Sequence, residues 1–335
     1  MIIVGDQSHP VDFSILDPAT RINKFPNTNP LCRKDLMWNN FKAMQKKFGK
    51  KYFAFMPETF NYPAEARSLK IKIKKYNNQA LWICKPPRGS QGNGIILAKT
   101  LKEIPDRISN TIVQRYITDP MLINGLKFDL RIYVLLTSVD PLKLYIYEDG
   151  LVRFATEEFS LNEEHLKDKF RHLTNYSVNK NSEKFEYNES PGEFYGHKWS
   201  MKTFWKYLEM KGIDWQRVWR RIKNTTVKTI MCGLPDILQG QKQLFHRSDY
   251  SKNIFSVFKK ESQSDYNSYK LFGVDFFLDE AMKPWLLELN NFPSMEKASL
   301  DRWVNDPMIA ETYNVAGFHY TGKPNAKQKQ VIAYY

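Results

Sequence analysis

The pattern of apolar positions towards the end of the chain predicts a β-hairpin in a buried sheet. Residues 271–278 and 285–289 are two strongly apolar runs, and the polar stretch 279–284 joins them. Apolar runs of this length on either side of a short polar connection are typical of paired antiparallel strands. Two acidic residues, Asp275 and Glu288, interrupt the apolar runs.

A second strong pattern lies at residues 127–137, where apolar and polar side chains alternate. Alternation with a period of two predicts a strand whose successive side chains point to opposite faces. Lys127, Asp129 and Arg131 therefore project from one face of this strand. Charged groups on a strand that is otherwise apolar need partners, because an unpaired buried charge is costly.

Turn formers and helical spacing locate the other elements. The sequence Glu148-Asp149-Gly150 is typical of a turn, and we expect it to join residues 142–147 and 151–155 in a second hairpin. We also expect helices at 29–48, at 64–75 and within 196–212 and 218–234, strands within 80–99 and at 111–117, and a polar loop at 172–180.

The two acids of the hairpin indicate a metal site. Closing the turn on residues 280–283 places Asp275 directly opposite Glu288, with Asn290 on the same face as Glu288. Cross-strand neighbours lie about 5 Å apart, and two carboxylates at that distance oppose pairing unless a positive charge neutralises them. Carboxylate and amide oxygens are ligands that Mg²⁺ prefers. We therefore expect Mg²⁺ here, with a solvent-facing pair at a sheet edge as the alternative.

A glycine-rich stretch inside residues 80–99 predicts a loop that covers phosphate groups. Its glycines permit close approach of the backbone to a ligand, while Lys85 and Arg88 supply positive charge. The spacing matches neither the dinucleotide-binding pattern GxGxxG nor the Walker pattern GxxxxGK[ST]. An ordinary tight turn is the alternative.

Composition and charge narrow the class of protein. A chain of 335 residues is long enough for two or three domains. Its 3 cysteines form no CxxC pair, which predicts that the protein lies in a reducing compartment and has no structural zinc. No apolar run approaches the length of a membrane span. We expect a soluble cytoplasmic protein. The net charge of +14 favours an anionic partner.

Seven motifs follow one another along the chain in an order that is specific for one family. The motifs are RKDLMWNN (33–40), CKPPRGSQGNGI (84–95), VQRYI (113–117), KFDLRIYV (127–134), GLVRFA (150–155), HLTNYSVNK (172–180), and FGVDFFLDE (272–280) with PWLLELN (284–290). Over residues 23–318 the chain thus resembles the tubulin tyrosine ligase-like family, an ATP-grasp group, and within it the tubulin polyglutamylases.

The resemblance implies an α+β, ATP-grasp-like fold. It places a nucleotide cleft between a small lobe with the glycine-rich loop and a larger C-terminal mixed sheet with helices. The expected divisions are an N-terminal basic lobe at 1–78, a central ATP-grasp lobe at 79–124, a catalytic lobe at 125–320 and a tail at 321–335.

The resemblance also implies a role for each matching residue. Arg131 is expected to reach the γ-phosphate and to act in catalysis with Lys85 and Glu288. One or two Mg²⁺ ions are expected on Asp275, Glu288 and Asn290. The incoming glutamate is expected on Arg153, Tyr176, Ser177 and Lys198. ATP is expected on Lys85, Gln91, Gly92, Gln114, Arg115, Tyr116, Ile117, Lys127, Phe128, Asp129, Thr174 and Asn175, while His172 is expected to line the pocket or to be structural.

The activity implied is amide-bond formation between free L-glutamate and a side-chain carboxylate, through an acyl phosphate made from ATP. The implied partners are acidic tubulin C-terminal tails or microtubules, with no nucleic acid and no membrane. This places the protein in the cytoplasm, on the cytoskeleton and at the base of a cilium or flagellum. The alternatives are a glycylase, a glutamylase of another acidic protein, and a catalytically silent microtubule-binding module.

Three features depart from the family pattern. Asn291 follows the metal-binding asparagine at a position that varies in the family, so initiation and elongation of branches both stay open. Asn305 stands where the family carries a lysine that helps to bind the amino acid, so Lys297 or Arg302 is expected to supply this charge. The chain also ends at Tyr335 without a long basic extension, so either the basic segments 46–51 and 70–75 contact the acidic partner or the acceptor is not an assembled microtubule.

Overall fold

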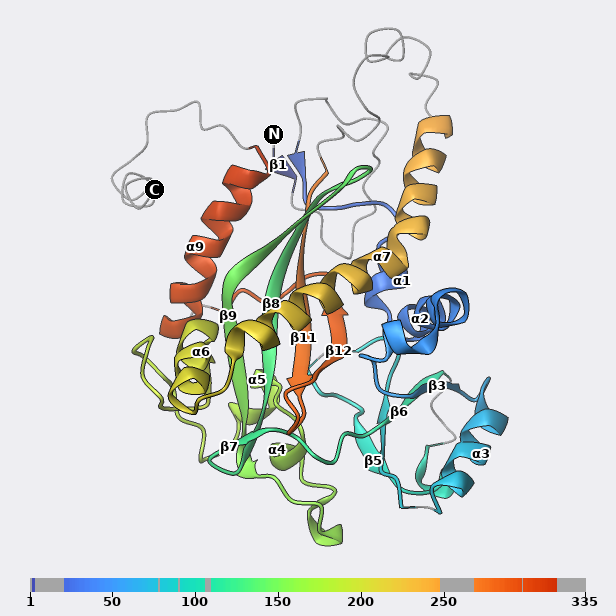
Figure 1. The fold of residues 1–335 in the computed structure, drawn as a ribbon, viewed down its shortest axis with the longest axis vertical. Coiled ribbons are helices and arrows are strands. Elements are labelled where there is room, and N and C mark those ends of the chain that lie inside the picture. The colour runs from blue at the N-terminus through green and yellow to red at the C-terminus, as the bar shows by residue number, and fades with distance from the viewer. Residues whose placement is uncertain are drawn as a thin grey trace, which may run out of the picture.

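The computed structural model describes residues 2–3, 21–77, 79–89, 91–105, 110–247, 268–296 and 298–317. Within them, the larger sheet is antiparallel and has the strand order β10-β9-β8-β11-β12, with the short β7 paired to β8 (Figure 1). Its strands are β7 (Leu122–Ile123), β8 (Leu126–Val139), β9 (Leu142–Glu158), β10 (Lys198–Ser200), β11 (Lys270–Leu278) and β12 (Pro284–Asn290).

A smaller antiparallel sheet has the strand order β3-β6-β4-β5. Helix α3 (Ala66–Lys75) covers it, because Leu69 and Ile73 are buried in one cluster with Trp82 of the sheet. A separate parallel pair joins β1 (Ile2–Ile3) to β2 (Arg21–Ile22). The strands of the smaller sheet are β3 (Thr59–Tyr62), β4 (Trp82–Lys85), β5 (Ile96–Ala98) and β6 (Thr111–Arg115).

Helices cover both faces of the larger sheet, and α7 crosses one of them (Figure 1). The helix expected at 29–48 is divided into α1 and α2, and the loop expected at 172–180 contains α5 and the end of α4. No helix in the described parts of the chain has the length and apolar character needed to cross a membrane. The helices besides α3 are α1 (Asn29–Cys32), α2 (Lys34–Phe48), α4 (Lys169–His172), α5 (Tyr176–Asn179), α6 (Met201–Met210), α7 (Trp215–Arg247) and α9 (Ser299–Val315), with 3-10 turns at Lys50–Phe53, Leu101–Glu103 and Glu163–His165.

Strand β8 lies at the centre of two hydrophobic layers. Phe128, Leu130 and Ile132 pack in the main core, which also contains residues of α2, α6 and α7. The alternate residues Tyr133 and Leu135 pack in a second cluster with α9. The predicted alternation is therefore correct, and the charged face of the strand is the one that continues towards α9.

The expected hairpin at Glu148-Asp149-Gly150 is wrong, because β9 continues through these residues as one strand. The ladder with β8 shifts here, since Ile132 pairs with Gly150 whereas Val134 pairs with Ile146. The turn-forming residues therefore form a bulge within the strand. The Asp149 carboxylate accepts hydrogen bonds from the backbone of Gly150 at 2.8 Å and from that of α6.

The hairpin of β11 and β12 is confirmed, and Asp275 lies opposite Glu288 as predicted. Nearer the turn the register differs by one residue, because Leu278 pairs with Pro284 and Phe276 with Leu286. A bulge between these two registers restores the predicted pairing at the acids.

Replacing Gly150 by alanine is expected to destabilise the fold. An added Cβ would lie 2.3 Å from the backbone oxygen of Arg131, which cannot move away without disturbing β8. We expect the free energy of unfolding in urea to fall by about 3 kcal/mol. Gly212→Ala is the control, because no atom lies within 4 Å of its Cβ and only its φ of +70° opposes alanine, which costs about 1 kcal/mol. Equal losses in the two variants would contradict the proposed clash.

Candidate functional site

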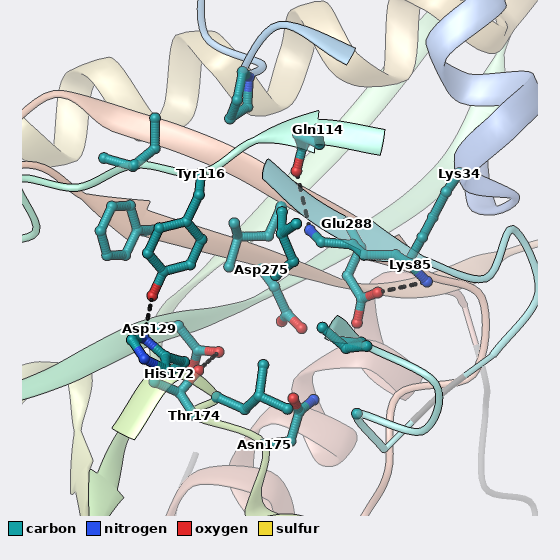
Figure 2. Close-up of a pocket in the computed structure, with 18 of the residues that line it drawn as sticks. Lys34, Lys85, Gln114, Tyr116, Asp129, His172, Thr174, Asn175, Asp275 and Glu288 are labelled. Atoms are coloured by element: carbon teal, nitrogen blue, oxygen red, sulfur yellow. Dashed lines mark hydrogen bonds and ion pairs between the residues drawn. The ribbon is translucent and has the colours of Figure 1, made fainter. Parts of the chain in front are cut away.

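One pocket lies between the two sheets (Figure 2). Strands β4 and β6 and the glycine-rich loop form one wall, and β8, β11 and β12 form the other. The structure brings every residue on which ATP is expected to this pocket, apart from Arg131, which was expected to reach the γ-phosphate; Asp275, Glu288 and His172 line it as well. Arg131, Arg153, Tyr176, Ser177, Lys198 and Asn290 do not line it.

At one wall of the pocket, Lys85 is held by a chain of hydrogen bonds. Its Nζ donates to Oε1 of Gln114 at 3.0 Å, and Nε2 of Gln114 donates to Oγ1 of Thr59 at 2.9 Å. No acid within the described residues pairs directly with Lys85, and burial lowers its pKa to about 8. A lysine held in this way is ready to receive an anionic ligand.

The glycine-rich loop closes over the same space. Gly92 has φ +76°, and a Cβ at this position would lie 2.9 Å from Val178 and 3.2 Å from Leu173. Only glycine fits both the backbone conformation and the contact with α5. Ser177, an expected glutamate ligand, instead donates from Oγ to the backbone oxygen of Gln91 at 3.3 Å.

At the other end of the pocket, a hydrogen-bonded relay orients Lys127. Its Nζ donates to Oη of Tyr116 at 2.9 Å and to the backbone oxygen of His172 at 3.0 Å. Oη of Tyr116 lies 3.0 Å from Nδ1 of His172, whose Nε2 faces the backbone oxygen of His165 at 3.1 Å. These partners place the imidazole proton on Nε2, so the tyrosine donates to Nδ1.

The same burial controls protonation in this relay. It lowers the pKa of Lys127 to about 7, with a further contribution from the charge of Lys85. Burial likewise lowers the pKa of His172 to about 4. The histidine is therefore neutral near pH 7 and serves as an acceptor.

At the floor of the pocket, four charged side chains form a buried network across three adjacent strands, and Asp129 and Asp275 of this network line the pocket. Arg153 donates to both oxygens of Asp129, at 2.7 and 2.8 Å, and also lies 3.0 Å from Oδ2 of Asp275. Arg131 binds Asp275 through Nε and, at 2.9 Å, through Nη2. The register explains the network, because Asp129 lies opposite Arg153 and Arg131 opposite Asp275.

This network corrects the argument that a metal must neutralise the acids of the hairpin. Burial alone would raise the pKa of Asp275, but Arg131 and Arg153 outweigh it and hold this pKa well below its usual range. Glu288 is neutralised separately by Lys34, whose Nζ lies 2.9 Å from its carboxylate. Cationic side chains of the protein therefore already compensate both acids. The repulsion between Asp275 and Glu288 does not require Mg²⁺.

The donor set is nevertheless one that suits a hard cation. Asp275, Glu288 and Asn290 offer carboxylate and amide oxygens, and Nδ2 of Asn290 lies 3.3 Å from Oδ2 of Asp275. No group of three or more His, Cys, Asp or Glu side chains that could hold a metal occurs in the described ranges. These residues therefore fit Mg²⁺ only as part of a shell that a phosphate or water completes.

The residues expected to hold the amino acid lie beside the network. Lys198 on β10 lies opposite Arg153 on β9 in the strand register. Nζ of Lys198 lies 2.7 and 2.9 Å from the two carboxylate oxygens of Asp301 and 3.8 Å from the centre of the Tyr176 ring. Asn305 is buried one turn after Asp301, and neither of its amide atoms has a hydrogen-bond partner in the part of the chain described. Of the two expected substitutes for the family lysine, Arg302 is exposed and Lys297 lies outside the described residues.

Lys34 also lines the pocket, although no pattern in the sequence predicts a place for it there. It is the first residue of α2, and Figure 2 shows it reaching towards Glu288. Its Nζ also donates to the backbone oxygen of Gly89 at 3.3 Å, so it joins the loop to the hairpin. The motif RKDLMWNN contains this lysine, but no local pattern indicates that it meets residues far along the chain.

Comparison with known proteins gives consistent similarities. A family model described as the tubulin-tyrosine ligase family matches residues 13–325. The chain is 40% identical over 299 residues to tubulin monoglutamylase TTLL4 of Homo sapiens, which covers 89% of this chain and 23% of that protein. It is 36% identical over 320 residues to tubulin polyglutamylase TTLL5 of Mus musculus (94% and 22%) and 38% identical over 291 residues to tubulin polyglutamylase TTLL6 of Mus musculus (86% and 33%). The chain thus spans between about a fifth and a third of the length of these relatives.

Replacing Arg153 by methionine is expected to destabilise the fold, because it leaves Asp129 without its buried partner and Asp275 with one partner fewer. We expect a loss of about 3–5 kcal/mol in the free energy of urea unfolding. Adding Asp129→Asn should recover part of this loss, since the unpaired charge is then removed. Lys184→Met is the control, because its ion pair with Glu157 is exposed and should cost about 0.5 kcal/mol or less. A loss as small as that of the control would show that the network contributes little.

Proposed function

Because the chain belongs to the tubulin-tyrosine ligase family, we propose that it is an ATP-dependent ligase that joins glutamate to side-chain carboxylates of an acidic protein, with tubulin as the acceptor. The observation that carries this proposal is the pocket between the two sheets. The residues expected to hold ATP line this pocket, and Arg131 and the residues expected to hold the amino acid lie next to its floor. On this proposal the protein works at the cytoskeleton.

The residues of the pocket have separate tasks in this reaction. ATP, when bound, supplies the phosphoryl group that activates the acceptor carboxylate, and the amine of glutamate then displaces phosphate to form the isopeptide bond. Lys85 and the glycine-rich loop bind phosphate oxygens and exclude water. Tyr116 and His172 hold Lys127 at a fixed position. The guanidinium of Arg131 stabilises negative charge near the reacting groups. It does so through the N–H groups that do not bind Asp275.

A Mg²⁺ ion would be held by Asp275, Glu288 and Asn290. It would screen the charge of the phosphates during transfer. Glu288 would then give up its ion pair with Lys34, and Asn290 would offer its amide oxygen in place of the Nδ2 that now faces Asp275. Glu288 is suited to the exchange, because its side chain is 22% exposed whereas that of Asp275 is 3% exposed.

A second candidate, ligation of glycine, is favoured by one observation. Arg153 and Lys198 are both engaged by acids, and Asn305 contributes no charge, so the site offers little uncompensated positive charge to a second carboxylate. Glutamate remains the first candidate, because Arg153 and Lys198 are adjacent and each can share its charge with a substrate carboxylate. A silent binding module is disfavoured by the cost of keeping this many buried charges.

The test is incubation of tubulin with the protein, Mg-ATP and equal concentrations of glutamate and glycine, followed by mass spectrometry. We expect branches of glutamate on acidic tail peptides, with glycine incorporated less often by roughly tenfold or more. Equal or greater incorporation of glycine would favour the second candidate. Absence of both, with tubulin and with other acidic proteins, would overturn the proposal.

Glu288→Gln is the matched negative variant for this assay. The amide cannot hold Mg²⁺ as the carboxylate does, so we expect incorporation to fall by about a hundredfold or more while the melting temperature stays close to that of the wild type. Glu65→Gln is the control, because Glu65 pairs with a lysine at the same distance of 2.9 Å outside the pocket. If the two variants incorporated glutamate equally well, the role given to Glu288 would be wrong.

Nucleotide binding is expected to take up protons at alkaline pH. In the empty pocket Lys85 and Lys127 have lowered pKa values of about 8 and about 7, so both are largely neutral at pH 8.5 and largely charged at pH 6. A bound polyanion raises both pKa values, and about one proton or more should enter per ADP at pH 8.5. Calorimetric titrations with ADP in two buffers of different ionisation enthalpy measure this number. Lys127→Met should lower it and Lys143→Met should not; equal heats in both buffers at pH 8.5 would contradict the prediction.

A further inference from the structure

The C-terminal end of α2 carries an exposed surface that the nucleotide pocket does not use. Phe48 and Tyr52 are 49% and 51% exposed and lie close together at this end of the helix. Lys47 and Lys51 are exposed next to them. We call this surface the α2 patch and define it as Lys47, Phe48, Lys51, Tyr52 and Lys228.

The α2 patch has a defined structure. Gly49, with φ +95°, ends α2 and turns the chain so that a 3-10 turn presents Tyr52. Lys47 lies over the ring of Phe48 at 5.2 Å, and Lys51 lies over the ring of Tyr52 at 4.9 Å. Aromatic faces and ammonium groups are thus arranged in pairs.

Helix α7 completes the α2 patch from a distant part of the sequence. Nζ of Lys228 donates to the backbone oxygen of Tyr52 at 3.1 Å and lies 5.9 Å from the centre of its ring. Met231, one turn further along α7, is 44% exposed. Exposed apolar side chains and positive charges therefore lie together on this surface.

The charge of the α2 patch is uncompensated, unlike that of Lys72 in the other basic segment. Lys72 on α3 pairs with Glu58 at 2.6 Å. Among the residues that the structure describes, no acid lies within ion-pair distance of Lys46, Lys47, Lys50 or Lys51. Lysines without acidic neighbours favour an anionic partner, and the exposed rings favour one that also has apolar side chains.

Helix α2 sets the distance between this surface and the pocket. It begins at Lys34, which contacts Glu288, and ends at Phe48 beside the α2 patch. Its 15 residues span about 20 Å at 1.5 Å per residue. An extended chain that follows α2 covers this length in about six residues.

We propose that the α2 patch binds an acidic segment of the acceptor that carries aromatic or aliphatic side chains, about six residues away from the carboxylate in the pocket. This inference rests on the proposed function, because it identifies where the acceptor of that reaction is held. The segment's carboxylates contact the lysines, and its apolar side chains cover Phe48, Tyr52 and Met231. A basic or purely neutral segment would not bind there.

The test measures binding of a fluorescent, glutamate-rich peptide of about twelve residues with two phenylalanines, by anisotropy at two salt concentrations. Lys47→Glu with Lys51→Glu should weaken binding by roughly tenfold at low salt and less at high salt. The matched control is Lys206→Glu with Lys211→Glu, which makes the same change of charge on exposed residues of α6 and its C-terminal end. We expect less than about a twofold effect from it. Equal weakening by the two double variants, or by neither, would overturn the proposal.

Tyr52→Ser separates the apolar part of the proposal from its charge, because every lysine stays in place. It should weaken the peptide with phenylalanines several-fold and leave an all-glutamate peptide unchanged, whereas equal effects on the two peptides would overturn the apolar contact. Peptide binding needs neither ATP nor glutamate. Failure of the tubulin assay with normal peptide binding would therefore overturn only the proposed function, and normal tubulin modification with indifferent variants would overturn only this inference.

Discussion

The buried charges of Asp129, Arg131, Arg153 and Asp275 are the constraint on which the rest of the structure depends. Transferring each ion from water into the interior of the sheet costs several kcal/mol, and only close, bidentate pairing offsets that cost. Such pairing requires β8, β9 and β11 to be adjacent in one register. Burial of these four charges therefore goes together with three other features of the fold. These are the arrangement of the strands, the bulge at Gly150 and the neighbouring pocket.

A large part of this solution is predictable from local pattern. The alternation in β8 identifies its charged face, and the symmetry of the terminal hairpin identifies the pairing of Asp275 with Glu288. Both are decided by residues close in sequence, where the period of side-chain direction is fixed. The motifs also indicate which residues line the pocket, because every motif except GLVRFA contributes at least one residue to its lining.

Contacts between residues far apart in the sequence are not predictable from local pattern. The residues Glu148-Asp149-Gly150 are typical of a turn in the sequence, whereas the bulge that they form pairs with β8 and receives a hydrogen bond from the backbone of α6. From the sequence the acids of the hairpin need a metal, because nothing in it indicates that Lys34 and two arginines meet them. Charge compensation is a property of the folded chain, and a pattern within a short window does not contain it.

The two-layer packing of β8 also determines how the site can fail. A slip of this strand by one residue would turn Leu130 and Ile132 towards α9 and drive Asp129 and Arg131 into the apolar layer beneath α6 and α7. Every neighbouring ladder would lose its register at the same time. A partly slipped state of β8 is therefore high in free energy. A change that disrupts the pairing at the centre of the charged site destabilises the whole fold.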